Sequence, residues 1–394
     1  MNTDGHHVDT DFISAGGPDN YTWNLVRSEA DHLVFQHARE CGSTVIDGIR
    51  VDALQFTHAD APYSDTDSYS EELGFTRPVS ATYIRKSDGK TGSIDFQYVV
   101  DASGRAGMIN TKCRKDRRYS KILKNSAHLC YWSGAKEYAV GTDSENSSYF
   151  EALYDESGWA WMIPLHDGTV FVGIVQNQEM GNARKRDLPA DGSTQDFYMN
   201  SLRLAPNITD MLSNARCETS VRSASDYSYS SASYAIPYAR VVGDAGCFID
   251  PFFSSGVHLA LTGALSAAMT ICAALRHDCD EKTAAAWHST KVGDAYMRFL
   301  LVVLSAYRQM WRQDASVWSE IATDNFDKAF DCVQPIIQGA ADADPVVTSE
   351  RVSRALDFCS HAVNTAQPDV KARLRHKHAT DSATVEEGDA LKHL

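Results

Sequence analysis

The chain has 394 residues, of which 43% are hydrophobic and 23% are charged, and its formal net charge at pH 7 is −15. A chain of this length can bury a sizeable core in two or three interleaved subdomains. The negative charge argues against a nucleic acid or an anionic membrane as partner, and the sequence offers neither a signal-peptide core nor an apolar run of membrane length.

The first clear element in chain order is a helix. Apolar residues recur at helical spacing from Ala30 to Cys41, and Gly42 supplies a stop after them. Short strands are then expected near residues 44–51. A further pair of strands is expected around a turn at residues 87–90, followed by a buried strand at residues 96–100.

That buried strand runs into a chemical signal. Asp101-Ala102-Ser103-Gly104 keeps side chains small where the backbone has to approach a ligand or another segment closely. A tight turn that needs glycine explains the same residues, and the motif by itself favours the turn.

Residues 127–177 predict strands with many aromatic side chains. Trp159 and Trp161 project to the same side of one strand, because alternate residues share a face. Such a pair suits the roof of an aromatic substrate or of a flat cofactor. The commoner alternative is an ordinary sheet core.

A strand, a turn and a long helix follow at residues 241–275. Asp244 follows the strand and can accept hydrogen bonds from a hydroxylated ligand. The helix is expected from Gly256 to about Leu275, with Ser254 and Ser255 as caps of its first turn. Free backbone N–H groups at a helix start suit a small anion. A purely structural strand–turn–helix is the equal alternative.

The rest of the chain predicts helices and few polar sites. Residues 284–299 and 300–321 have helical spacing, and residues 366–394 are polar, without periodicity, and predicted to be disordered.

Nine cysteines without a Cys-x-x-Cys pair predict reduced, mostly buried thiols. No cluster has the spacing of metal ligands, so no metal is expected. We therefore expect a soluble, cytoplasmic protein.

Four of these motifs, in this order, carry a family resemblance. They are Arg-Ser-Glu-Ala-Asp from Arg27, Asp-Ala-Ser-Gly-Arg from Asp101, Gly-Trp-Ala-Trp-Met-Ile-Pro from Gly158, and the segment from Gly243-Asp244 through Ser255-Gly256-Val257-His258. Together they resemble the flavin-dependent halogenases, specifically the fungal, free-standing, phenol-directed kind. The resemblance spans residues 18 to 335. It implies a mixed α/β fold of the FAD-dependent monooxygenase type, as in p-hydroxybenzoate hydroxylase.

The resemblance also implies a domain plan. Residues 1–126 with 235–280 would form an FAD-binding domain that lacks its first βαβ unit. Residues 127–234 would form a substrate-binding β-sheet domain, and residues 281–365 a helical C-terminal region.

The chemistry implied by the resemblance is chlorination of a phenolic or similar aromatic secondary metabolite. A separate reductase supplies reduced FAD, which with oxygen oxidises chloride to hypochlorous acid. Chloride would lie at the backbone amides of Ser255 and Gly256, with the flavin beside Val257. FAD would also be contacted by Gly243 and Asp244, and Arg27 and Asp101 match further positions of the flavin domain. Trp159 and Trp161 would steer the reaction away from direct oxygenation of the substrate.

Two features of the family pattern do not occur in this sequence. No Gly-x-Gly-x-x-Gly unit for the FAD pyrophosphate precedes Arg27, and no lysine precedes Lys86, so no residue matches the family's catalytic lysine. We therefore expect an N-terminally truncated member with impaired activity. A degenerate relative that binds an aromatic ligand or a partner is the first alternative, and a flavin-dependent aromatic hydroxylase is the second.

Overall fold

The computed structural model describes residues 22–57, 77–189, 191–225, 227–311, 333–343 and 349–364. The expected tail at 366–394 lies outside them. The described residues belong to two compact units. The first unit takes in residues 22–47 and 121–225 with 309–311, and the second takes in residues 48–120, 227–308 and the described residues from 333 to 364. Each unit is described by itself.

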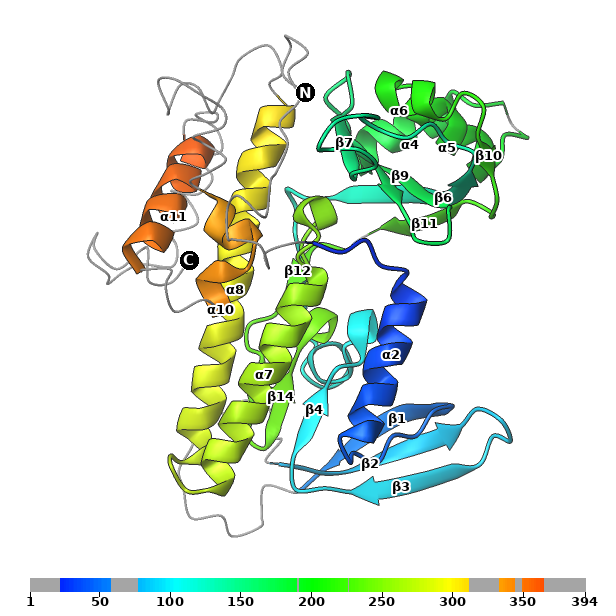
Figure 1. Ribbon diagram of the computed structural model, residues 1–394. Helices are drawn as coiled ribbons and strands as arrows, with labels where there is room; N and C mark the ends of the chain where they lie inside the picture. The colour runs from blue at the N-terminus through cyan, green and yellow to red at the C-terminus, as the bar shows by residue number, and fades with distance from the viewer. Residues whose placement is uncertain are drawn as a thin grey trace. The chain divides into compact units, whose positions relative to one another are not determined.

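An antiparallel sheet forms the centre of the first unit (Figure 1). Its strands lie in the order β10-β6-β9-β8-β7, and β11 pairs with the other half of β6. Their bounds are β6 Asn125–Ser133, β7 Tyr149–Ala152, β8 Gly158–Pro164, β9 Val170–Asn177, β10 Arg216–Cys217 and β11 Arg222–Ser225. The helices of this unit are α2 Arg27–Glu40, α4 Gln178–Arg186, α5 Thr194–Leu202 and α6 Pro206–Met211. The predicted helix before Gly42 is thus confirmed.

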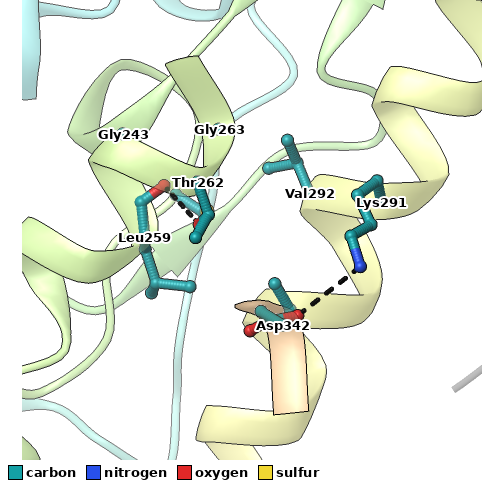
Figure 2. Close-up of a pocket in the computed structure, with 9 residues that line it drawn as sticks. Gly243, Leu259, Thr262, Gly263, Lys291, Val292 and Asp342 are labelled. Carbon is teal, nitrogen blue, oxygen red and sulfur yellow. Dashed lines mark hydrogen bonds and ion pairs between the residues drawn. The ribbon is translucent and has the colours of Figure 1, made fainter. Parts of the chain in front are cut away.

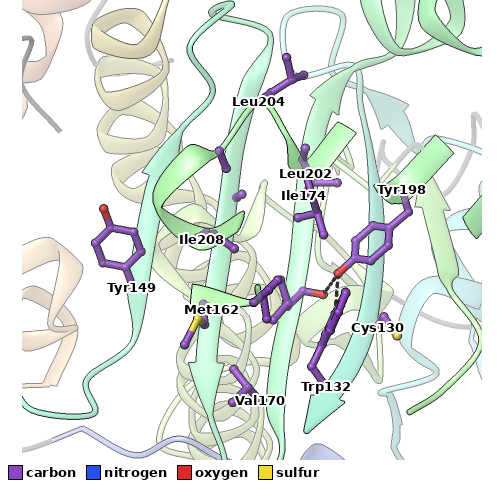
Figure 3. Close-up of a cluster of buried hydrophobic side chains, with 14 of the residues drawn as sticks. Cys130, Trp132, Tyr149, Met162, Val170, Ile174, Tyr198, Leu202, Leu204 and Ile208 are labelled. Carbon is purple, nitrogen blue, oxygen red and sulfur yellow. Dashed lines mark hydrogen bonds between the residues drawn. The ribbon is translucent and has the colours of Figure 1, made fainter. Parts of the chain in front are cut away.

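One face of this sheet packs on α5 and α6 (Figure 3). Trp132 on β6 donates its indole N–H to the hydroxyl of Tyr198 on α5 at 3.1 Å, and Tyr198 donates to the carbonyl of Val172 at 3.1 Å. These bonds satisfy polar groups inside an otherwise apolar core. Because Met162 lies on this face, its neighbours Trp159 and Trp161 on β8 project to the opposite one, as predicted.

A disulfide corrects the expectation of reduced thiols. Cys130 on β6 is bonded to Cys217 on β10, although 87 positions separate them in the chain. The two strands are neighbours in the sheet, with Cys217 opposite Trp132. Sequence spacing carries no signal of this pairing, because only the strand order brings the two sulfur atoms together.

The second unit contains three small sheets among its described residues. An antiparallel sheet contains β1 Ile49–Phe56, β2 Pro78–Arg85 and β3 Thr91–Asp95. A second sheet has the order β13-β14-β4, in which β14 Ala239–Val241 runs parallel to β4 Val99–Asp101 and antiparallel to β13 Ala235–Ile236. A separate two-stranded sheet pairs β5 Arg118–Tyr119 with β12 Tyr229–Ser230. The parallel pair ends at the two motifs that matter most, Asp101 and Gly243.

Two long helices lie side by side in this unit (Figure 1). Helix α7 spans Gly256–Leu275, as predicted. Helix α8 spans Glu281–Met310 as one element, whereas the sequence predicted a division at residue 300. His288 of α8 joins the layers, because one ring nitrogen lies 2.9 Å from Ser266 Oγ of α7 and the other 3.1 Å from the carbonyl of Val241. The short α10 Ala340–Ala343 and α11 Ser349–Asn364 follow.

Helix α7 differs from the prediction that the sequence has no apolar run of membrane length. By length and composition alone it could cross a membrane, and 28% of the relevant window is buried. One side of the helix carries large exposed apolar residues, namely Val257, Leu261, Leu265, Met269 and Leu275. We call this side the α7 apolar face.

Candidate functional site

The loop after β4 is organised by Asp101. Its carboxylate is buried, and its two oxygens accept the backbone N–H of Ser103 at 3.0 Å and of Ile109 at 2.7 Å. The chain makes a 3-10 turn, η1 Gly104–Ala106, and then a π-helix, η2 Met108–Cys113. π-helical turns are rare and occur often at functional sites. Asp101 therefore shapes this loop with both of its carboxylate oxygens.

A matching turn follows β14. Gly243 begins the 3-10 turn η3 Gly243–Ala245 with φ +55°, and a Cβ atom there would come within 3.1 Å of Ala260 on α7. Both conditions favour glycine. The two loops are joined at their base, because the N–H of Val242 donates to the carbonyl of Asp101 at 3.0 Å. The structure thus brings Asp101, Gly243 and Asp244 to one edge of the parallel strand pair.

The first turn of α7 has no side-chain cap. Ser254 has a left-handed backbone, and Ser255, 5% exposed, occupies the N-cap position without a capping hydrogen bond from its hydroxyl. The predicted side-chain cap is therefore wrong. The carbonyl of Ser255 accepts the N–H of Leu259 at 2.9 Å, so the helix begins there. The N–H groups of a first helical turn have no acceptor within the helix, and they remain available to an anion.

A pocket beside this turn contains a buried carboxylate (Figure 2). Asp342 of α10 lies 3.3 Å from His258 Nε2 and 3.7 Å from Lys291 Nζ, and Arg298 also pairs with it. Burial by itself would raise the pKa of Asp342, but the hydrogen bond to His258 and the charges of Arg298 and Lys291 leave it below its usual value. Asp342 thus links α10 to His258 of α7, the residue after Val257, and to α8. No sequence motif indicated this contact.

The predicted tryptophan pair lies in the first unit. The ring centroids of Trp159 and Trp161 are 5.3 Å apart, and the side chains are 2% and 5% exposed. Trp161 lies over Gly173 of β9, where any Cβ atom would collide with the indole ring. Among the described residues, the indole nitrogen of Trp161 has no hydrogen-bond partner. The pair is therefore both packed into its sheet and left with one buried donor.

Arg27 also lies in the first unit. It begins α2, its side chain is 64% exposed, and it pairs with Asp31 one turn later at 3.1 Å. The second unit collects the other predicted site residues, which are Asp101, Gly243, Asp244, Ser255, Gly256 and Val257.

Comparison with known proteins decides the family. The sequence profile described as Tryptophan halogenase matches residues 79–350. The flavin-dependent halogenase ascD of Acremonium egyptiacum is 49% identical over 98% of this chain and 71% of its own length. This chain belongs to the flavin-dependent halogenases. The sulochrin halogenase gedL of Aspergillus terreus is 44% identical to this halogenase over 97% of the chain and 69% of the relative.

Solved structures identify the fold of this halogenase. The flavin-dependent brominase Bmp2 gives a TM-score of 0.67 at 17% identity, covering 87% of this chain and 76% of that chain. The halogenase PltM in complex with phloroglucinol and FAD gives 0.61 at 15% identity, covering 91% and 73%. The mixed α/β architecture is that of an FAD-dependent monooxygenase, and the family makes the chain an FAD-dependent oxidoreductase. The predicted fold class and family are confirmed.

The residues of the second unit fit FAD. Gly243 has a left-handed backbone and lets α7 pack closely on the turn, which brings the first turns of the helix next to Asp244. The uncapped first turn of α7 and the turn at Asp244 supply backbone donors and a carboxylate, which suit phosphate and hydroxyl groups respectively.

Proposed function

We propose that this halogenase chlorinates a phenolic metabolite with reduced FAD, oxygen and chloride, and that a separate reductase supplies the reduced FAD. A phenolic substrate is supported by two matched proteins, since gedL is named a sulochrin halogenase and PltM was solved with phloroglucinol. The single observation that supports a chloride site is the start of α7, where the buried Ser255 leaves the first-turn amides without a side-chain cap.

The predicted site residues of the second unit have distinct roles in this proposal. The amides of Ser255 and Gly256 hold chloride by hydrogen bonds and by the positive end of the α7 dipole. Val257 lies against the flavin. Gly243 permits close approach of the backbone, and Asp244 accepts from a hydroxyl of the cofactor. When bound, FAD supplies the oxidising chemistry that converts chloride to an electrophile.

Asp101 acts on the cofactor through its loop. Both of its carboxylate oxygens already accept backbone N–H groups, so the residue fixes the path of the chain rather than the ligand. Arg27 contributes in the proposal as part of the FAD-binding segment 1–126 with 235–280.

Trp159 and Trp161 have a steering role in residues 127–234, the proposed substrate-binding domain. Both side chains are buried, 2% and 5% exposed, so in this proposal they act by excluding water and by the shape of the wall that they form on β8. In this proposal the pair favours halogenation over direct oxygenation, and the comparisons support neither the hydroxylase nor the degenerate relative better than a halogenase. A cytoplasmic location and a helical C-terminal region at 281–365 complete the proposal.

Flavin titration is the test. The purified chain is titrated with FAD, and quenching of flavin fluorescence is followed. Turnover is then measured with a flavin reductase, chloride and a panel of simple phenols, and the products are identified by mass spectrometry. Because this sequence has no Gly-x-Gly-x-x-Gly unit and no match to the family's lysine, weak FAD binding and little turnover are expected, and any chlorinated phenol should require both reductase and chloride. Chlorinated product with oxidised FAD alone would contradict the mechanism, and hydroxylated product without chlorination would favour the hydroxylase.

A further inference from the structure

One arginine outside the family motifs joins the two loops of the second unit. Arg117 lies directly before β5, and its guanidinium Nη2 donates to the carbonyls of Ala245 at 3.1 Å and of Asp244 at 3.4 Å. Its Nη1 donates to the carbonyl of Arg105. One side chain therefore serves acceptors from both the loop after β4 and the turn η3.

The guanidinium of Arg117 stacks on the ring of Tyr229 on β12. The centre of the guanidinium lies 4.0 Å from the ring centroid of Tyr229, and the tyrosine hydroxyl donates to the same Asp244 carbonyl at 2.7 Å. Burial raises the pKa of Tyr229 to about 12, against the opposing charge of Arg117. The hydroxyl thus stays protonated at neutral pH and remains a donor.

Gly107 leaves the space that the guanidinium occupies. Its φ is +56°, and a Cβ atom there would collide with Nη2 of Arg117 and come 2.9 Å from the carbonyl oxygen of Ala245. The glycine of the first loop, the arginine and the carbonyl of the second loop are thus fitted to one another. This three-part packing distinguishes the contact from an arginine that happens to rest on the surface.

We propose that Arg117 is a positioning residue for FAD. It holds the Gly243–Ala245 turn at a fixed separation from the loop that begins at Asp101, and so sets the backbone that faces the cofactor. The inference rests on the proposed function, which assigns Gly243 and Asp244 to FAD and gives Asp101 the shaping of the neighbouring loop. The guanidinium holds five N–H donors in a rigid plane that spans separated carbonyls, whereas the three N–H donors of a lysine radiate from one nitrogen on a flexible stem.

The variant Arg117→Lys tests this geometry because it keeps the positive charge. A matched control is Arg114→Lys, three positions earlier, since the Arg114 side chain pairs with Asp116 at 3.0 Å and donates to the carbonyl of Ala235 at 3.2 Å, and neither partner belongs to residues 103–107 or 243–247. Any loss of FAD affinity that is specific to Arg117→Lys then reports the geometry of the loops, and general destabilisation or loss of charge does not explain it.

Two measurements are made on the full chain. Amide hydrogen exchange of residues 103–107 and 243–247 is compared among parent, Arg117→Lys and Arg114→Lys, and the Kd for FAD is measured by fluorescence quenching. We expect Arg117→Lys to speed exchange in both loops and to weaken FAD binding by about tenfold, the effect of one to two lost hydrogen bonds. Arg114→Lys should change neither by more than about twofold at a comparable Tm.

The outcomes separate this inference from the proposed function. Unchanged exchange in both loops would overturn it, and so would faster exchange with an FAD affinity equal to that of Arg114→Lys. If the parent binds no FAD, the assignment of the site to FAD fails and the positioning role fails with it, while exchange still decides whether Arg117 joins the loops. Tyr229→Phe, which removes one donor to Asp244 and keeps the ring, should give an intermediate change.

Discussion

The indole ring of Trp161 lies over Gly173, the residue opposite it on the neighbouring strand. A methyl group at position 173 would occupy the space of the indole, so the glycine determines where the ring lies. Trp161 is 5% exposed and also contacts Phe171, whose ring centroid is 5.4 Å away. The steering role proposed for the tryptophan pair therefore depends on a residue with no side chain.

Gly173→Ala should displace Trp161 and cost about 1–3 kcal/mol of stability, because an overfilled core forces side chains off their rotamers. Near-UV circular dichroism should change in the tryptophan region, and thermal unfolding should give the lower stability. Gly181→Ala in α4 is the matched control, since a Cβ there meets only ordinary contacts at 3.8 Å or more. An unchanged tryptophan spectrum in Gly173→Ala would contradict the packing described.

Ser255→Pro should abolish halogenation by removing one amide of the proposed chloride site. The φ of Ser255 is −71°, which proline can adopt, but proline disfavours the left-handed backbone of Ser254 before it. Ser255→Ala is the control, because it keeps the amide and loses no capping bond. Product formation is measured over a range of chloride concentrations in a preparation that turns over. Chlorination by Ser255→Pro at the rate of Ser255→Ala would refute the placement of chloride.

Glu281→Gln should destabilise the second unit by about 3–5 kcal/mol, since it leaves a buried arginine without its counter-charge. Arg240 is 0% exposed and forms two parallel contacts with Glu281, at 2.8 Å and 3.2 Å. Asp52→Asn, in an exposed pair with Arg50, should cost less than about 1 kcal/mol. Urea unfolding gives both values, and equal values would contradict the structural role of the buried pair.

Acid should destabilise the second unit through His288. Burial is the main cause that lowers the pKa of His288 to about 4, with the charge of Arg240 acting in the same direction. An unfolded histidine titrates near 6.5, so the stabilisation is present above about 6.5 and is lost as pH falls toward 4. The loss is about 2 kcal/mol at pH 5.

The free energy of unfolding between pH 7.5 and pH 5 measures this effect. His288→Gln should reduce the dependence, leaving the share of buried His128, whose pKa is also lowered to about 4, while exposed His37→Gln in α2 should leave it as steep as in the parent. A parent protein equally stable at both pH values would contradict the burial of a neutral histidine.

Cys217→Ser should destabilise the first unit by about 4 kcal/mol, because the disulfide to Cys130 closes a loop of 87 positions in the unfolded chain. Unfolded protein prepared without reductant should show two fewer reactive thiols than after reduction. Cys272→Ser, at an exposed free cysteine, is the control and should change neither stability nor the difference in thiols. A full thiol count before reduction would rule out the bond.

Local patterns predicted what local physics controls. The bounds of α7, the end of β4 at Asp101 and the common face of Trp159 and Trp161 each depend on residues within a few positions. The capping prediction failed at Ser255 because a suitable residue type at an N-cap does not ensure that its hydroxyl points back to the helix.

Contacts between distant segments carried no local signal. Arg117 reaches a turn more than 120 positions away, and Cys130 meets Cys217 only through strand order. Asp342 finds His258 through helix packing, in the same way. Single arginines, cysteines and aspartates are common in any sequence. Only the fold therefore shows which of them make these contacts. Helix α8 was divided in the prediction although no glycine or proline interrupts it near residue 300.

The α7 apolar face has a practical consequence for every unfolding experiment above. Environment-sensitive dyes fluoresce when they bind exposed apolar surface, and Leu261, Leu265 and Met269 offer such a surface in the native protein. A dye-based melt would begin with a high signal and could even fall on heating. The stabilities of these variants should therefore be followed by circular dichroism or intrinsic fluorescence, with low protein concentrations to limit association through this face.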